Sequence, residues 1–443
     1  MTWIEAGNRS MTKPGVLRAA IATIAFGFLI GSAVSVVGQD EAPPLPEEKI
    51  VVEIDAPDED VFRIGIPDLI GDNTNLAAAG GAILQNDFRL MPGFRVIGPS
   101  AVRHDSASPG LEVDVGAWAV LGANGVIKGQ AFGTDVGMSV ELRFYQSSGG
   151  VVPALRRSYR GPSTELRKWM HDFVNQVIGV ITGTYGPFGT EIAFARKHGP
   201  GQKSVYAAAM DGYGVRRVSS GGGVSMLPSF GKGSIWYTRM SKQGMFITNT
   251  RLGGKRIIGG KGITMAPAIC GARVYFSSSR AGNYEIYSSN LDGSGLRRLT
   301  RSQAIDVSPA CGPGGKLAFV SDRHGSPQIF SMNRDGSKVQ RVTFRGNHNQ
   351  TPVWCADAKQ PLIAFSGRDG NFDIFTVNVE TQQYTRLTQG QGDNKDPAFS
   401  RDCRLIAFTS NRRGSPGVYL SGQDGLEQNQ IIDGVAETVR WAR

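Results

Sequence analysis

Few residues of this chain have the types and spacing that catalysis requires. The sequence contains no G-x-S-x-G element of serine hydrolases, no H-E-x-x-H zinc motif, no P-loop and no dinucleotide fingerprint. The five histidines are not spaced as ligands of one metal ion: His104, His171, His198, His324 and His348. We therefore expect no catalytic residue, no cofactor and no metal site, and we predict that the chain is not an enzyme.

The four cysteines follow a series of regularly spaced prolines. Three lie two or three residues after Pro267, Pro309 and Pro352, and the fourth lies six residues after Pro397: Cys270, Cys311, Cys355 and Cys403. An even number of cysteines in an exported protein makes disulfides possible. The alternative is that four small buried thiols fill narrow spaces between repeats. The spacing fits no Cys-x-x-Cys metal site.

Polar side chains gather in three loops, each of which leads to one of these prolines. They are Asp306 before Pro309, Asn349 and Gln350 before Pro352, and Asp393, Asn394 and Asp396 before Pro397. Equivalent loops of a repeat protein meet at one end, so we expect these side chains to reach a common mouth. Polar and acidic groups there would suit a partner that presents hydrogen-bond donors and positive charge. The alternative is that they satisfy the backbone amides of turns.

A repeated four-strand unit must position these loops. A hydrophobic triplet recurs at residues 192–194, 235–237, 274–276, 317–319, 363–365 and 406–408. Tight Asp-Gly or Gly-Gly turns and the prolines keep the same period of roughly 40–45 residues, which is typical of a β-propeller. We predict a six-bladed β-propeller over residues 190–443. Residues 439–442 should pair with residues 192–195 and close the ring.

The preceding residues predict a different domain. Residues 76–90 and 164–181 carry apolar side chains at helical spacing, and Ser163 or Thr164 can cap the second helix. Short alternating strands lie around them, at 50–54, 61–66, 94–97, 126–132, 138–145 and 155–159, with a short helix at 113–121 that bears Trp118. The fold class is therefore mainly β, with an α/β domain at residues 50–185 in front of the propeller.

The first residues predict export. Residues 1–38 combine a basic start with an uncharged run and small residues, which indicates a signal peptide; an uncleaved anchor is the alternative. Residues 39–49 are acidic and proline-bearing, so they are a linker or a docking strand for a partner. The formal net charge is +10. Because the basic residues are scattered, we interpret it as a solvated surface and expect no nucleic-acid partner.

Several segments resemble the TolB family of the Tol–Pal system. They are the segment SPACGPGGKLAF at 308–319, the Leu-Thr pairs at 299–300 and 387–388, the Leu-Met-Pro-Gly-Phe run at 90–94, and Trp118 before the segment at 126–129. The order of signal, α/β domain and six repeats is also similar. The resemblance covers the chain from about Lys49 onward.

The resemblance implies a monomeric, non-enzymatic adaptor in the periplasm, without membrane insertion after signal cleavage. Its propeller face would bind the peptidoglycan-associated lipoprotein Pal, with Asn349 and Gln350 carried over from a Gly-x-x-Asn-Gln loop. Its N-terminal segment would bind TolA, through Asp40, Glu41, Glu47 and Glu48. The adaptor would support outer-membrane integrity and constriction at division. The loop at 262–266 lacks the expected polar residues. The alternative function is an exported propeller that binds or hydrolyses a glycan or peptide at its central funnel.

Overall fold

The computed structural model describes residues 61–72, 74–98, 110–135, 137–242, 244–357 and 359–442. The predicted signal peptide, the acidic segment with Asp40, Glu41, Glu47 and Glu48, the strand at 50–54 and His104 lie outside the described residues. Within the described part, no helix combines the length and the apolar character needed to cross a membrane.

The first part is an α/β domain built on a mixed sheet with strand order β3-β1-β4-β5-β6, and β2 beside β4. Its strands are β1 (Phe62–Gly65), β2 (Ile70–Gly71), β3 (Phe94–Ile97), β4 (Gly125–Thr134), β5 (Gly137–Gln146) and β6 (Leu155–Gly161). Its helices are α1 (Thr74–Leu90), α2 (Val115–Val120) and α3 (Leu166–Thr182). These elements agree with the predicted helices and strands to within a few residues.

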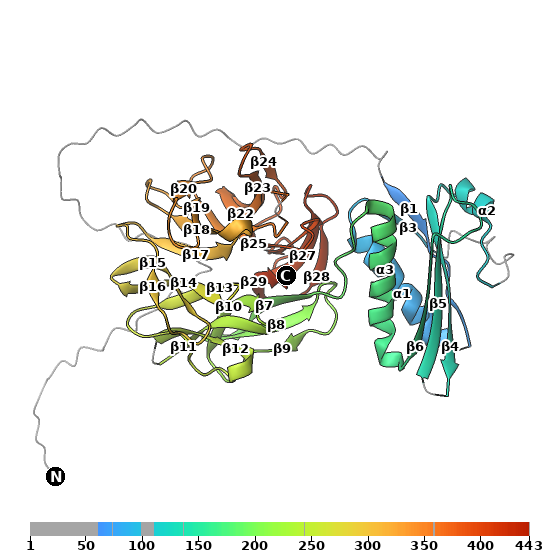
Figure 1. The fold of residues 1–443 in the computed structure, drawn as a ribbon, viewed down its shortest axis with the longest axis horizontal. Coiled ribbons are helices and arrows are strands. Elements are labelled where there is room, and N and C mark those ends of the chain that lie inside the picture. Colours follow the sequence, from blue (N-terminus) through green and yellow to red (C-terminus); the bar gives the residue numbers. More distant parts are fainter. Residues whose placement is uncertain are drawn as a thin grey trace, which may run out of the picture. The chain divides into compact units, whose positions relative to one another are not determined.

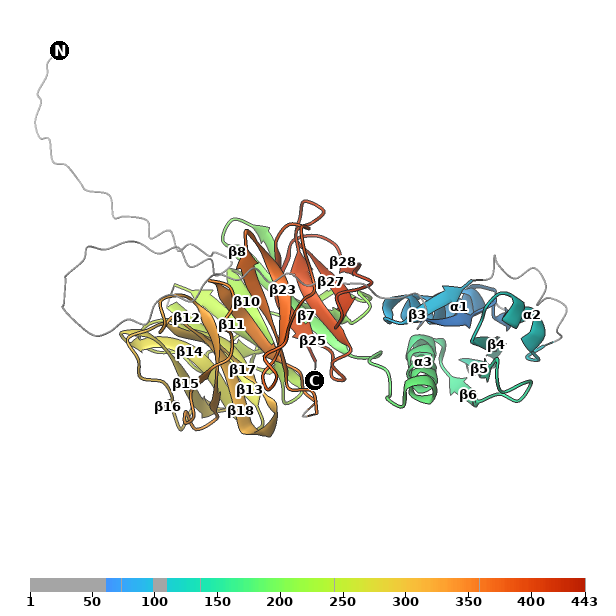
Figure 2. The ribbon, with the colours of Figure 1, turned by 90° about the horizontal axis from the view of Figure 1, so that it is seen from above.

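Strand alternation gives this sheet two apolar faces. Ile127 of β4 packs into the core with α1 and α3, whereas the adjacent Val126 packs with Trp118 of α2. Figure 1 shows α1 and α3 together on one side of the sheet, and Figure 2 shows α3 beside β4, β5 and β6. Trp118 is fully buried. The packing of this side chain therefore stabilises α2, which is too short to be stable as an isolated helix.

The predicted cap of the second helix is wrong. A short 3₁₀ turn, η4 (Ser163–Glu165), precedes α3, and neither Ser163 nor Thr164 makes a side-chain capping bond. The backbone N–H of Leu166 bonds to the carbonyl of Ser163 instead. Because the 3₁₀ turn uses the first amides of the helix, no hydroxyl is needed to satisfy them. At the other end, Gly183 adopts φ 75°, the left-handed conformation that ends a helix.

The second part is a propeller-like set of antiparallel sheets. Four sheets have four strands each, in the orders β13-β14-β15-β16, β17-β18-β19-β20, β21-β22-β23-β24 and β25-β26-β27-β28. A further sheet of seven strands has the order β12-β11-β10-β8-β7-β29, with β9 beside β8. The sheets therefore confirm the propeller-like β architecture, while the count of six blades stays a prediction.

The strands of the seven-stranded sheet are β7 (Glu191–Gly199), β8 (Gln202–Ala209), β9 (Arg216–Arg217), β10 (Val224–Gly231), β11 (Ser234–Ser241), β12 (Gly244–Asn249) and β29 (Ala436–Trp441). The next two sheets contain β13 (Thr264–Cys270), β14 (Arg273–Ala281), β15 (Asn283–Asn290), β16 (Arg297–Arg298), β17 (Asp306–Cys311), β18 (Lys316–Ser321), β19 (Gln328–Asn333) and β20 (Gln340–Arg341). The last two contain β21 (Asn349–Trp354), β22 (Leu362–Asp369), β23 (Asn371–Asn378), β24 (Tyr384–Arg386), β25 (Asn394–Phe399), β26 (Leu405–Ser410), β27 (Gly417–Gly422) and β28 (Asn429–Ile432). Two 3₁₀ turns are η5 (Thr250–Leu252) and η6 (Pro313–Gly315).

The innermost strands contact one another in a closed series, β10, β13, β17, β21, β25, β29 and back to β10. Each carries a break in register at the same place, and the residue there has a positive φ between 52° and 57°: Leu227, Ala266, Ser308, Thr351, Asp396 and Thr438. In all but the last, the next residue is the repeat proline. The recurring proline thus marks a bulge that the sequence did not reveal.

One predicted long-range contact is confirmed, and the choice between disulfides and free thiols is decided in favour of disulfides. Strand β29 pairs with β7 in antiparallel register, with Trp441 opposite Ile192 and Arg440 opposite Ala193. The cysteines form the two disulfides Cys270–Cys311 and Cys355–Cys403. The first links the inner strands of two neighbouring sheets. The interpretation of the cysteines as unpaired buried thiols is therefore wrong.

Candidate functional site

Three loops lead into inner strands at one edge of the propeller. We call them the lead-in loops: residues 299–305, 342–348 and 387–393, which run into β17, β21 and β25. The register pairs Asp306 with Ser321, Asn349 with Gly367 and Asn394 with Ser410. Each of these polar residues therefore begins an inner strand, opposite the end of the second strand of its sheet. The structure thus brings three of the six predicted side chains to equivalent places. Of the others, Gln350 is the second residue of β21, Asp393 ends a lead-in loop, and Asp396 lies at the bulge of β25.

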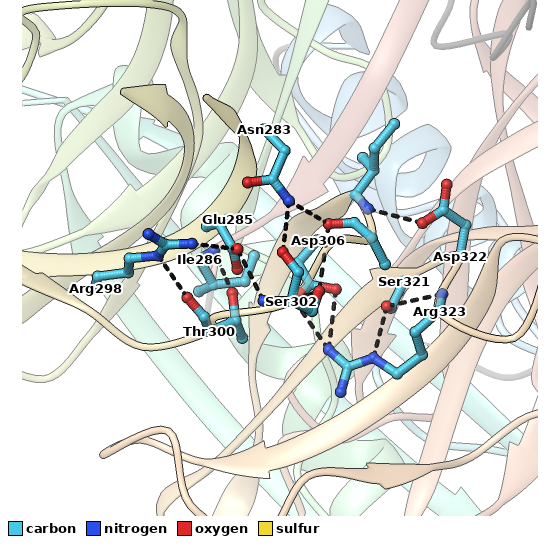
Figure 3. Close-up of polar contacts among 12 residues, drawn as sticks. Asn283, Glu285, Ile286, Arg298, Thr300, Ser302, Asp306, Ser321, Asp322 and Arg323 are labelled. Atoms are coloured by element: carbon cyan, nitrogen blue, oxygen red, sulfur yellow. Dashed lines mark hydrogen bonds and ion pairs between the residues drawn. The ribbon is translucent and has the colours of Figure 1, made fainter. Parts of the chain in front are cut away.

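Glu285 organises the first lead-in loop from β15 (Figure 3). Its Oε1 accepts hydrogen bonds from Arg298 Nη2 at 2.6 Å and from the Ser302 amide at 3.0 Å, and its side chain is fully buried. Asn283 Nδ2 donates to the carbonyls of Ser302 and Ala304, both at 2.8 Å. The loop is thus held along its length by two side chains of one strand.

Gln328 and Asp373 hold the other two lead-in loops in the same way. Gln328 Oε1 accepts from the hydroxyl of Thr343 at 2.6 Å and from Asn349 Nδ2 at 2.8 Å. Asp373 Oδ1 accepts from the hydroxyl of Thr388 at 2.7 Å and from Asn394 Nδ2 at 3.0 Å. We refer to Glu285, Gln328 and Asp373 as the three anchor residues. All are buried near the start of a third strand.

The predicted acidic groups do not face outward. Asp306 is fully buried and receives both of its close guanidinium contacts from Arg323 Nη2, at 3.1 and 3.0 Å (Figure 3). Burial raises the pKa of Asp306, and the Ser321 hydroxyl and Arg323 oppose that shift. Asp396 is also buried; its Oδ2 accepts from the Thr438 amide at 3.1 Å, and burial raises its pKa.

The remaining predicted residues are paired as well. Asp393 Oδ1 accepts from the Phe372 amide at 3.0 Å, and its Oδ2 accepts from Lys395 Nζ at 2.9 Å. Burial works to raise the pKa of Asp393, but Lys395 and the Phe372 amide hold it below its usual value. Gln350 is buried with its Oε1 3.4 Å from His348 Nε2. Burial lowers the pKa of His348.

The exposed side chains of the lead-in loops are therefore different from those predicted. They are Arg301, Gln303, Phe344, Arg345, Asn347, Gln389 and Gln391. Sequence reasoning missed these residues and the three anchor residues. The sequence did contain one regularity: each anchor residue lies eight or nine positions after the last residue of a hydrophobic triplet. This spacing shows that a polar residue recurs in the third strands, but it does not show that its side chain binds a loop.

A second polar cluster surrounds His171 of α3. Its Nδ1 lies 2.6 Å from Asp87 Oδ2, and its Nε2 lies 3.8 Å from Asp211 Oδ2, which also pairs with Arg167. Because the two carboxylates approach opposite ring nitrogens, the imidazole bridges them and does not share one metal ion with both. The side chains of Asp87, His171 and Asp211 are at most 7% exposed, so the cluster has no access for a substrate.

Two family models match the chain in these two parts. The model of the TolB amino-terminal domain matches residues 50–150, and that of the TolB beta propeller domain matches residues 179–366. The chain belongs to the TolB family. The match to both models follows the order of the α/β domain and the propeller-like sheets.

Curated relatives and a solved structure agree with this family. A Tol-Pal system protein TolB from Desulfosudis oleivorans is 32% identical over 235 residues, which cover 51% of this chain and 53% of the relative. One from Geobacter sulfurreducens is 33% identical over 159 residues, 36% of each chain. The matches thus span about half the length of these relatives or less. The crystal structure of TolB from Acinetobacter baumannii shares the fold, with a TM-score of 0.75 at 22% identity over 86% of this chain and 96% of that chain.

Proposed function

We propose that this chain is a periplasmic, non-enzymatic adaptor of the Tol–Pal envelope system. The observation that carries the proposal is the presence of both TolB domains in one chain, in the order α/β domain and then propeller. The relatives bear the name of Tol-Pal system proteins. In this role the protein would support outer-membrane integrity and constriction during division, and would act as a monomer between two partners.

The propeller has six blades in this proposal. Strands β10 and β8 are parallel and share only the pair Val224 and Lys203. The seven-stranded sheet is then two blades, β29-β7-β8-β9 and β10-β11-β12, that meet at this pair. The closed series of six inner strands supports this division.

Pal would bind at the lead-in loops. The anchor residues tie these loops to the third strands, so their exposed side chains are ordered before a partner arrives. A rigid surface binds with a smaller entropic cost than a mobile one. Asp306, Asn349, Gln350, Asp393, Asn394 and Asp396 then act mainly by fixing the loop backbone, and the exposed residues of the same loops supply the contacts.

TolA would bind to residues 39–49, through Asp40, Glu41, Glu47 and Glu48. This acidic segment has too few apolar residues to fold by itself. It is therefore suited to add to the sheet edge of a partner. Its other interpretation is a plain linker between the export signal and the first strand.

Isothermal titration calorimetry with two purified partner domains tests the proposal. The soluble domain of a Pal-type lipoprotein should bind the full mature chain, and also a chain that starts at residue 50. The C-terminal domain of a TolA-type protein should bind the full mature chain only. Binding of TolA by the shortened chain would make residues 39–49 a linker. Absence of Pal binding, or turnover of a glycan or peptide by the purified protein, would contradict the adaptor role.

A further inference from the structure

Every one of the six sequence repeats places an arginine within three residues of the end of its second strand. We call these residues the arginine rim: Arg196, Arg239, Arg280, Arg323, Arg368 and Arg412. Each second strand runs antiparallel to an inner strand, so that its end lies beside the start of that inner strand. In the first repeat, Arg196 lies opposite Ala436, the first residue of β29. The rim therefore follows the edge that carries the lead-in loops.

Aromatic rings hold most of these guanidinium groups in place. Arg280 lies 5.7 and 5.2 Å from the ring centres of Phe276 and Tyr287. Equivalent ring pairs lie under Arg196, Arg323 and Arg412, at 4.5 to 5.5 Å. Several of these guanidinium groups are also bonded within the protein. Arg323 Nη2 donates to Asp306, Arg412 Nη2 to Asn394 Oδ1, and Arg280 Nη2 to the Gly259 carbonyl. Their side-chain freedom is therefore restricted before a ligand arrives.

The acidic side chains at this edge are largely used within the protein. Asp306 is buried against Arg323, and Asp373 is buried against Arg386 Nη2 at 2.5 Å. Asp393 pairs with Lys395. The exposed basic residues at the same edge are Lys197, Lys242, Lys261, Arg301, Arg345, Arg368 and Arg413. Exposed acids are Asp369, which pairs with Arg386, and Asp433. Among the described residues, the outward charge of this edge is therefore positive, contrary to the expectation of an acidic mouth.

We propose that the exposed basic residues at this edge, together with the lead-in loops, bind an acidic polypeptide segment, whose carboxylates these basic side chains receive. This inference rests on the proposed function and gives the chemistry of the partner at that site. Planar guanidinium groups match carboxylates in two-point hydrogen bonds. Their fixed spacing around a rigid edge favours a folded or extended polypeptide over a lipid surface, which needs no such order.

The test uses charge reversal at Arg368, which is an exposed member of the arginine rim, and at Arg413, the exposed neighbour of the rim residue Arg412. Arg368 donates to the Gly370 carbonyl, and Arg413 donates to the side chain of Gln430, so neither neutralises a buried carboxylate. The variant is Arg368→Glu with Arg413→Glu. The control is Arg401→Glu with Lys359→Glu, which changes charge equally at exposed turns between inner and second strands, at the opposite edge. Circular dichroism verifies that both variants are folded.

The probes are a soluble (Glu-Ser) repeat peptide, a (Gln-Ser) peptide of the same length, phosphatidylglycerol vesicles and the soluble domain of a Pal-type lipoprotein. The acidic peptide and the lipoprotein domain should bind more weakly as salt rises, and the rim variant should lose at least about tenfold in affinity, since like charges across an interface are costly. The control variant should bind as the parent chain does. The (Gln-Ser) peptide should not bind.

Four results would overturn the inference. The acidic peptide does not bind at low salt, or the (Gln-Ser) peptide binds as tightly as it does. The rim and control variants lose affinity equally, or only the vesicles bind in a way that depends on the rim residues. If the affinity for the lipoprotein domain changes neither with salt concentration nor in the charge-reversal variant, the proposed function stands and the inference is rejected. Rim-dependent binding of the acidic peptide without any lipoprotein binding would keep the inference and reject the Pal role.

Discussion

His171 Nδ1 lies 2.6 Å from Asp87 Oδ2, and this pair joins α3 to α1 inside the α/β domain. Both side chains are buried, and Asp87 Oδ1 has no hydrogen-bond partner among the described residues. Burial raises the pKa of Asp87, and His171 opposes the shift. His171 supplies the hydrogen bond to this carboxyl group, and the positive charge of Arg167 lies close enough to act on it as well.

Replacement of His171 by Leu should therefore destabilise the α/β domain strongly. Removal of His171 leaves the buried Asp87 carboxyl group without its hydrogen-bond partner, which costs about 1–3 kcal/mol, and more where the group is charged. The double variant Asp87→Val with His171→Leu should regain most of this loss. Urea unfolding, followed by circular dichroism at 222 nm from α1 and α3, measures both. His198→Leu is the control, because His198 is exposed and should change stability by less than about 0.5 kcal/mol. A double variant as unstable as the single one would contradict the prediction.

Deletion of residues 437–443 should lower the melting temperature sharply. Strand β29 pairs with β7 along its inner edge. Trp441 of β29 is 4% exposed, and its Nε1 donates to the Thr190 hydroxyl at 2.8 Å. Loss of the strand exposes the backbone edge of β7 and the apolar surface beneath it. Differential scanning calorimetry gives the result, and an unchanged curve would mean that β29 does not hold the ring together.

The disulfides should contribute substantially to stability. Cys270–Cys311 and Cys355–Cys403 close loops with sequence separations of 41 and 48 residues. Restriction of the unfolded chain by a loop of that length is worth about 4 kcal/mol for each bond. Alanine pairs at each bond should lower the urea midpoint of the parent chain under oxidising conditions. In dithiothreitol the parent should approach the variant that lacks both bonds. A parent that is equally stable in both conditions would argue against this contribution.

Acidification should weaken the propeller through His348. Burial lowers the pKa of His348 below its ordinary value of 6.5. The unfolded chain therefore binds a proton first as pH falls below 6.5, and the free energy of unfolding decreases from there through the folded pKa. His348→Gln should reduce this dependence. Urea midpoints of both proteins at pH 7.5 and 5.5 provide the comparison, and equal pH dependence in both would exclude the effect.

Replacement of Asn349 and Gln350 by Ala should weaken Pal-type binding by about 1–3 kcal/mol, the usual cost of removing buried polar groups at an interface. Asn349 Nδ2 donates to the Arg345 carbonyl at 2.8 Å, so its loss frees the exposed part of the lead-in loop. Calorimetry on the folded variant measures the change. Asn378→Ala is the control, because Asn378 is the last residue of β23 and its Oδ1 accepts from the amides of the turn that follows, away from the lead-in loops. Parent-like affinity of the double variant would move the site away from this loop.

Local sequence patterns were sufficient to predict the strands. The side-chain partners that lie far apart in sequence could not be predicted from them. The triplet at 317–319 became a buried strand, because alternation and turn residues act within a few positions. Asp306 was expected to face a partner, yet its neighbour Arg323 becomes visible only once β17 and β18 are in register. The same limit applies to Glu285, which reads as an ordinary strand residue until the loop it binds is in place. The cysteine pairing likewise required knowledge of which inner strands are neighbours.

The pairing of β29 with β7 has a consequence for how the chain folds during its synthesis. Trp441 and Thr190 are 251 positions apart, so the ribosome completes every other strand of these sheets before β7 finds its neighbour. Until then β7 presents an unprotected edge to which another chain can add. A ring that closes only with this strand therefore stays open, with its inner strands accessible, until synthesis of the propeller-like sheets is finished.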